Sequence, residues 1–450
     1  MTRCVKLWGW LVMVVLLAAL PVPQEALAVM VGSRVGTTVV TTGADDHDDA
    51  TNTSIGKESD AGVDGGSDMY ATAVGYDATA TGTKSTATGS NSDATAEYAT
   101  ATGNDATATG TKSTATGGDS DATANYATAT GADSEAGGRF STATGYGSKA
   151  SGSESTATGN NTIASGYGGT ATGGQSVASG SYSTATGAFS DATADYTTAN
   201  GYKANATGTK STALGTLANA NGDYSTATGY EAKATGINNT ATGSNSYATG
   251  QYSTALGSYA YAREKESTAT GYNATATGTN STAIGAQAAA SQDGAVALGK
   301  GSTASAIYSA AIGTKSTASQ EGATALGRSS TASATQSTAL GKDATASASN
   351  SVALGYASEA TEANTVSVGS DGNKRRITNV AAGVNDTDAV NMSQLNAVQS
   401  QVTTNATSIS TNTDNISQNS NDIADNASAI SNNSAAIAVN TESISVNATS

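Results

Sequence analysis

The stretch that decides the fold begins Gly75-Tyr-Asp-Ala-Thr-Ala-Thr-Gly82-Thr-Lys-Ser-Thr-Ala-Thr-Gly89 and continues in the same rhythm. From Gly75 a glycine recurs every 14 residues as far as Gly369, so 22 glycines stand in register without an insertion or deletion. Of the 21 positions midway between them, 11 are also glycine. A fixed short period of this kind indicates a solenoid.

Each 14-residue unit predicts one coil of two short β-strands joined by two tight turns. Side chains two apart in a strand share a face, so Thr86 and Thr88 lie on one face and Ala87 lies on the other. Glycine closes each strand because it can take the positive φ that a tight turn needs. The alternative is disorder, since Gly, Ser, Thr and Ala dominate. A disordered tract, however, has no reason to keep register over 21 repeats, and this one lacks proline.

Length, composition and charge limit the other possibilities. The 450 residues carry a net charge of −16 and only 5% aromatic residues, which cannot fill a conventional globular core. Stability must then come from stacking repeats on one another and from association of several chains. The excess of acid argues against nucleic acid as a partner.

Residues 1–28 predict a secretory signal peptide. Arg3 and Lys6 precede an apolar stretch at 7–20, and Ala26-Leu27-Ala28 has the small residues of a cleavage site. The alternative is an uncleaved anchor, for which the apolar stretch is short. The only cysteine, Cys4, lies here, so the exported chain would contain no disulfide.

Residues 29–68 predict an irregular acidic segment. Asp45-Asp46-His47-Asp48-Asp49 offers oxygen ligands of the kind that calcium prefers, but the spacing fits no known binding loop. We therefore expect a solvated acidic loop and no metal site. His47 is the only histidine, and no catalytic constellation can be built around it, so we expect no enzyme activity.

The composition of the repeat changes along the chain. The residue before each 14-step glycine is mostly threonine early, as at Thr88, and always aliphatic from Leu298 onward. We expect this position and the one two before it to face the inside of the coil, which predicts a drier core in the C-terminal third. The recurring lysines are expected to be solvated turn residues rather than a ligand patch, and the recurring tyrosines either contact residues or shields of the turn; these are Lys84, Lys112, Lys210, Lys315, Tyr98, Tyr126 and Tyr196.

After Gly369 the period stops and a distinctive segment, 370–395, follows. It resembles the neck of the trimeric autotransporter adhesins, the YadA-like surface proteins of Gram-negative bacteria. The preceding repeats resemble the left-handed parallel β-roll head of that family, whose usual unit, Ser-Val-Ala-Ile-Gly, is close to Ser351–Gly355. The residues that carry the neck resemblance are Lys374, Arg375, Arg376, Ile377, Thr378, Asn379, Val380, Asp388, Ala389, Val390, Asn391, Gln394 and Leu395.

Residues 396–450 predict a coiled-coil stalk. Aliphatic residues recur every seven positions from Leu395 to Ile444, and an asparagine follows three residues after each one from Val402 onward. This spacing puts the aliphatics at position a and the asparagines at position d of a heptad. In the resembling family, rings of three such amides hold an anion such as chloride; the alternative is that they only set register and oligomer number. The asparagines are Asn405, Asn412, Asn419, Asn426, Asn433, Asn440 and Asn447.

The resemblance implies an exported, homotrimeric, non-enzymatic surface protein associated with virulence. Its head, 69–369, would attach to host matrix, host cells or other bacteria through many weak contacts. The family's C-terminal outer-membrane anchor has no counterpart up to Ser450, so we expect either a fragment or a different means of anchoring. Two other functions stay open: a phage-fibre-like structural role, and ice binding by outward Thr-x-Thr ladders, which inward-facing threonines would exclude.

Overall fold

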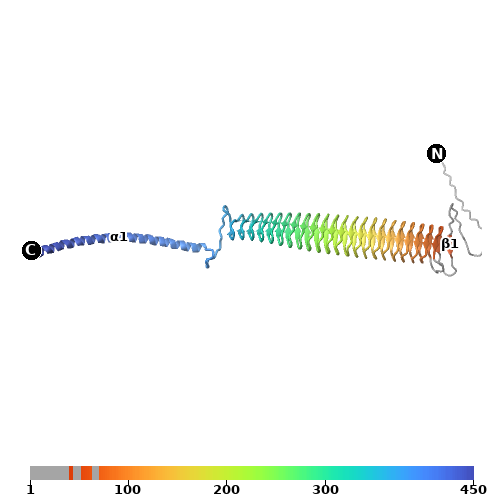
Figure 1. The fold of residues 1–450 in the computed structure, drawn as a ribbon, viewed down its shortest axis with the longest axis horizontal. Coiled ribbons are helices and arrows are strands. Elements are labelled where there is room, and N and C mark those ends of the chain that lie inside the picture. The colour runs from red at the N-terminus through yellow and green to blue at the C-terminus, as the bar shows by residue number, and fades with distance from the viewer. Residues whose placement is uncertain (1–39, 44–51, 63–69) are drawn as a thin grey trace, which may run out of the picture. The chain divides into compact units, whose positions relative to one another are not determined.

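The computed structural model describes residues 40–43, 52–62 and 70–450 (Figure 1). The predicted signal peptide and the acidic cluster at Asp45–Asp49 lie outside these residues. The chain divides into two compact units, with the boundary between Asn373 and Lys374.

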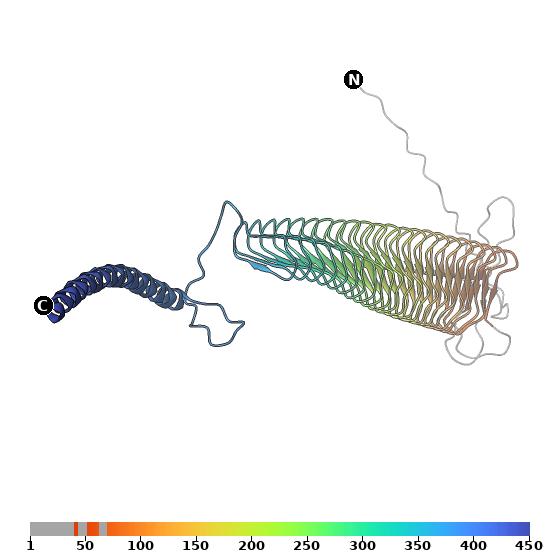
Figure 2. The same ribbon diagram turned by 60° about the vertical axis from the view of Figure 1, so that its left-hand side comes forward.

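The first unit is a parallel β-solenoid, as the period predicts (Figure 2). Each coil contributes a three-residue strand and a two-residue strand. The three-residue strands recur every 14 residues from β4 (Thr72–Val74) to β44 (Val352–Leu354), and the two-residue strands from β5 (Thr79–Ala80) to β45 (Glu359–Ala360). Each strand pairs in parallel with its equivalent one coil away, as in β6 (Thr86–Thr88) beside β8 (Thr100–Thr102). The last strand, β46 (Val366–Ser367), pairs with β44.

The regular structure starts earlier than the period suggests. Strands β2 (Asn52–Ile55) and β3 (Asp60–Ala61) form a further coil that pairs in parallel with β4 and β5. Strand β1 (Val40–Gly43) lies antiparallel to β2 and covers that edge of the sheet. The expectation that 29–68 is irregular is therefore wrong for these three strands. Gly56 stacks on Gly75, which is 19 residues later, so five extra residues hide this coil from the 14-residue step.

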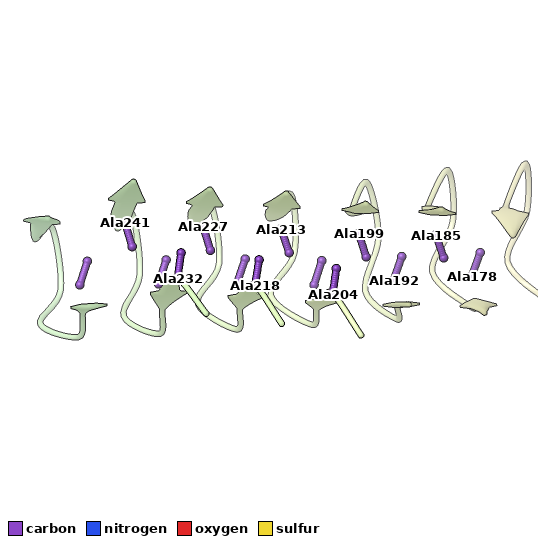
Figure 3. Close-up of a cluster of buried hydrophobic side chains, with 14 of the residues drawn as sticks. Ala178, Ala185, Ala192, Ala199, Ala204, Ala213, Ala218, Ala227, Ala232 and Ala241 are labelled. Carbon is purple, nitrogen blue, oxygen red and sulfur yellow. The ribbon is translucent and has the colours of Figure 1, made fainter. Parts of the chain in front are cut away.

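The core of the solenoid consists of alanine. Ala87 and Ala94 in adjoining strands are fully buried, and so are their equivalents through the stack. Figure 3 shows alanines of the two sheets pointing toward one another. By contrast, Thr88 is exposed and Thr86 is half-buried on the outer side of the same strand. The expectation that these positions face inward, and that the C-terminal third has a drier core, is wrong. The sheets lie too close for larger side chains, so Leu298 and its successors are on the outside.

Buried serines fall into two groups. Ser134, three residues after Gly131, donates its hydroxyl to that glycine's carbonyl at 2.8 Å. On the opposite turn, Ser141 follows Gly138 by the same interval, but its buried hydroxyl has no partner in the described chain. On the turn that carries Ser141, the serine lacks a partner wherever glycine stands three residues before it. Ser309 and Ser337 on the same turn follow Ala306 and Ala334 instead, and they donate to those carbonyls.

Replacing these two kinds of serine should have opposite effects on stability. Ser134→Ala removes a made hydrogen bond and should lower the free energy of unfolding by about 1 kcal/mol. Ser141→Ala removes an unsatisfied buried hydroxyl and should leave stability unchanged or raise it by about 1 kcal/mol. Urea denaturation of the two variants would measure the difference. Equal losses in both would contradict the assignment of Ser141 as unpaired.

The second unit contains the helix α1 (Met392–Thr449), which starts inside the segment assigned to the neck. Asn391 accepts from the backbone N–H of Gln394, and the Gln394 side chain accepts from the backbone N–H of Asn391, which forms a capping box. None of the helix's 58 residues is buried. Its sequence is rich in Asn, Ser and Thr, which are poor helix formers, so helix propensity alone gives it little stability.

Candidate functional site

The solenoid has two turn edges that present side chains outward. The first edge is the turn after each three-residue strand, at 76–77 and equivalent positions every 14 residues; the second edge is the turn after each two-residue strand, at 83–84 and equivalents. On both edges the second turn residue has a left-handed backbone, with φ of 52° at Asp77 and 57° at Lys84. Each coil therefore presents its two turn residues at each edge.

On the second edge, lysines and aromatic residues form a ladder. The ammonium of Lys84 donates to the hydroxyl of Tyr98 at 3.1 Å and lies 5.0 Å from the ring centroid. Lys112 lies between Tyr98 and Tyr126, at 5.8 and 5.3 Å from their ring centroids. Tyr126 then stacks on Phe140 at 4.8 Å. Because neighbouring coils occupy the ring faces, these residues stabilise the stack of turns and present ring edges and hydroxyls to the outside.

Further along the same edge, tyrosines continue the ladder. Tyr182 stacks on Tyr196 at 5.4 Å and packs edge-on against Tyr167 at 5.2 Å. The Tyr167 hydroxyl donates to the carboxylate of Glu154 at 2.8 Å, and this hydrogen bond raises the pKa of Tyr167 to about 12. The phenol therefore remains a neutral donor throughout the physiological pH range.

The outer face of the three-residue strands carries an apolar strip near its C-terminal end. Ile284 is 43% exposed and Leu354 is 42% exposed, so the described chain leaves much of this strip uncovered. A contiguous exposed apolar surface usually marks an interaction site. The strip consists of Ile284, Leu298, Ile312, Leu326, Leu340 and Leu354.

The neck segment and the start of α1 enclose an open hollow of about 900 Å³. The Asn391 amide donates to the carbonyl of Val380 at 3.2 Å, and the Gln394 side chain bonds both the N–H and the carbonyl of Gly383. Gly383 is not among the predicted neck residues. Of the predicted neck residues, the structure brings together around this hollow Arg376, Ile377, Thr378, Asn379, Val380, Val390, Asn391, Gln394 and Leu395.

The remaining predicted neck residues lie outside the hollow: Lys374, Arg375, Asp388 and Ala389. Asp388 has a local role, because its carboxylate accepts from the backbone N–H groups of Val384 and Asn385, at 2.9 Å each. These hydrogen bonds lower the pKa of Asp388. Within the hollow, apolar side chains remain open to solvent, with Ile377 at 69% and Val390 at 74% exposure.

On α1, the predicted a positions form an uncovered aliphatic row. The exposed fraction of each side chain in the row lies between 55%, at Val402, and 68%, at Ile444. The predicted asparagines alternate with this row on the same helix, from Asn405 to Asn447, and all are exposed in the single chain. The Oδ1 of Asn405 accepts from the Gln401 side-chain amide at 2.9 Å, and this hydrogen bond does not use the N–H groups of Asn405.

Models of two protein families match the chain. The YadA head domain repeat matches in successive, partly overlapping copies, from 69–92 and 94–120 through to 346–371. The coiled stalk of trimeric autotransporter adhesin matches residues 376–418. The chain belongs to the YadA-like trimeric autotransporter adhesins. The predicted head and stalk architecture of this family is thereby confirmed.

One solved structure similar to this YadA-like chain is the collagen-binding domain of the Yersinia adhesin YadA. It shares 29% sequence identity, and the match covers 43% of this chain and 86% of that domain, with a TM-score of 0.23. No curated protein matches the chain. Within the described residues, none of the helical structure is both long and apolar enough for a membrane span.

Proposed function

We propose that this chain is a homotrimeric, non-enzymatic adhesin displayed on the bacterial surface. The observation that carries the trimer is α1, a 58-residue helix of poor helix formers with an exposed aliphatic row and no buried residue. Such a helix needs partner helices to cover its row. Membership of a trimeric family supports three as the number of chains.

The apolar strip on the solenoid supports the same assembly. Its residues lie on the three-residue strands, and Val296 and Val352 lie beside it on the same outer face. Packing three copies with these faces toward a common axis would cover the strip. In the stalk, the asparagine rows would then face the axis, where three amides can donate to one chloride. The exposed apolar residues of the neck hollow would likewise contact the partner chains.

Adhesion in this proposal is multivalent. The remaining outward surface, the sheet of two-residue strands, repeats in every coil and in every chain. Many weak contacts to a repetitive host or bacterial surface ligand then act together, because each one raises the effective concentration of the next. In this arrangement no single residue is essential for binding, and the head need not contact the outer membrane.

The adhesive proposal predicts that trimerisation controls apparent affinity. In the chain from Val29, Ile416→Asp with Ile423→Asp should break the stalk and give monomers by mass measurement. Binding to immobilised matrix proteins should then weaken on the order of a hundredfold or more. Collagen is one suitable probe, since the Yersinia domain is described as binding it. A monomer that binds as tightly as the intact chain would contradict the multivalent mechanism, and an intact chain that is monomeric would contradict the trimer.

Ice binding requires a regular array of outward-facing threonines. The threonines of the solenoid do face outward, so their orientation does not exclude this function. On the three-residue strands, however, the proposed trimer covers that array. On the two-residue strands the row that contains Thr79 and Thr107 is interrupted in alternate coils by Asp93 and Asp121. No observation favours a phage-fibre role over an adhesin.

A further inference from the structure

The charged residues on the two turn edges have opposite signs in two blocks of coils, 76–140 and 293–343, and mixed signs in the coils between them. In the block at 76–140, four aspartates occupy the first edge, and three basic residues with one glutamate occupy the second edge. The aspartates are Asp77, Asp105, Asp119 and Asp133; the second-edge residues are Lys84, Lys112, Arg139 and Glu97.

Near the C-terminal end, the signs are the opposite. Basic residues now occupy the first edge, where Asp343 is the one acid among them, and two acids occupy the second edge. The basic residues are Lys300, Lys315, Arg328 and Lys342; the second-edge acids are Asp293 and Glu321.

The charged groups of these ladders are largely uncompensated within their own chain. Among the residues that the structure describes, Lys342 pairs with its neighbour Asp343 at 3.2 Å, and none of the others forms an ion pair. Lys84 and Lys112 contact neutral tyrosine rings instead. All these side chains are exposed except Asp105 and Asp343, which are half-buried. The two edges of one coil lie at opposite ends of its strands and cannot neutralise each other.

We infer that the edges are complementary docking surfaces for a second copy of this chain, and that they favour the in-register arrangement of the trimer. This inference rests on the proposed trimer. In a cyclic assembly each subunit meets the next through unlike sides, so the first edge of one chain lies along the second edge of its neighbour. At equal height Asp105 then meets Lys112, and Asp293 meets Lys300, of adjoining chains.

Three-fold symmetry makes neighbouring subunits parallel, so the question left to the edges is their axial register. A large axial shift between parallel neighbours would bring the first-edge aspartates against Asp293 and Glu321, or the first-edge lysines against Lys84 and Lys112. Exposed ion pairs add little stability individually, so the role of these ladders is to oppose such shifts, as charged flanks do in coiled coils.

Zero-length carbodiimide cross-linking of the dilute, intact trimer from Val29 tests the inference. It joins a carboxylate to an amine only when the two are in contact, and a link between opposite edges must join different chains. Peptide mass spectrometry should find Asp105 or Asp119 joined to Lys112 and Asp293 joined to Lys300, in covalent oligomers seen on a denaturing gel. Lys112→Gln should abolish the first link and leave the second, and Asp105→Lys with Lys112→Asp should restore the first.

The outcomes separate the two proposals. A chain that is monomeric by mass would overturn the trimer and this inference together. A stable trimer in which neither cross-edge link forms would overturn the inference alone. Links between opposite ends, such as Asp119 to Lys315, would also overturn it, because they would place neighbouring heads antiparallel.

Discussion

Replacing Gly117 by alanine should lower the free energy of unfolding of the head by more than about 3 kcal/mol. Gly117 has a φ of 136°, and a Cβ built on it would lie 2.5 Å from the carbonyl oxygen of Gly131 in the next coil. The obstacle is backbone rather than a flexible side chain, so the two coils would have to separate and lose their hydrogen bonds. Urea denaturation would measure the loss, and hydrogen exchange should show it concentrated in the coils on either side.

The adjacent glycine provides a matched control. A Cβ on Gly118 would have Asn104 O as its nearest contact, at 3.8 Å, and its backbone is not left-handed. Gly118→Ala should therefore be neutral, or stabilising by up to about 1 kcal/mol, because alanine restricts the unfolded chain. If both substitutions lower the free energy of unfolding by similar amounts, close stacking of Gly117 on the next coil is not the reason that glycine is needed there.

The second large effect is expected in the stalk. Asn412→Ile combined with Asn419→Ile should raise the melting temperature of the proposed trimeric stalk by about 10 °C or more. In that trimer, each substitution would replace three buried amides by aliphatic side chains of the kind already present at Ile409 and Ile416. The variant should also tolerate other registers, because an all-isoleucine core no longer specifies one. Circular dichroism melts and mass measurements would follow both changes.

An outward asparagine serves as the control. Asn421 occupies the heptad position farthest from the axis, so Asn421→Ile should leave the melting temperature unchanged. Crystals of the unsubstituted stalk grown in bromide should show anomalous peaks on the axis at Asn412 and Asn419. If those peaks are absent, the asparagines have only a role in register. If the double variant melts at a lower temperature, the expectation that the asparagine layers destabilise the stalk relative to isoleucine is wrong.

Local order could be predicted well from the sequence, because it depends on intervals along the chain. The 14-residue spacing from Gly75 to Gly369 predicts the coils, and the alternation at Thr86-Ala87-Thr88 separates two faces of each strand. The seven-residue spacing after Leu395 predicts the helix. The first coil was missed because five extra residues separate Gly56 from Gly75, and its stacking on Gly75 is visible only in three dimensions.

Which face is inside was decided by the tertiary structure alone. The alternation of residues along a strand identifies two faces, but it does not give the distance between the two sheets. That distance determines whether alanine or a larger residue fits between them. The sheets are close enough that Ala87 fills the space, so Leu298 and the threonines lie outside. The charges on the two edges also depend on the tertiary structure. Residues seven apart lie on opposite edges only because the chain turns back on itself within each 14-residue coil.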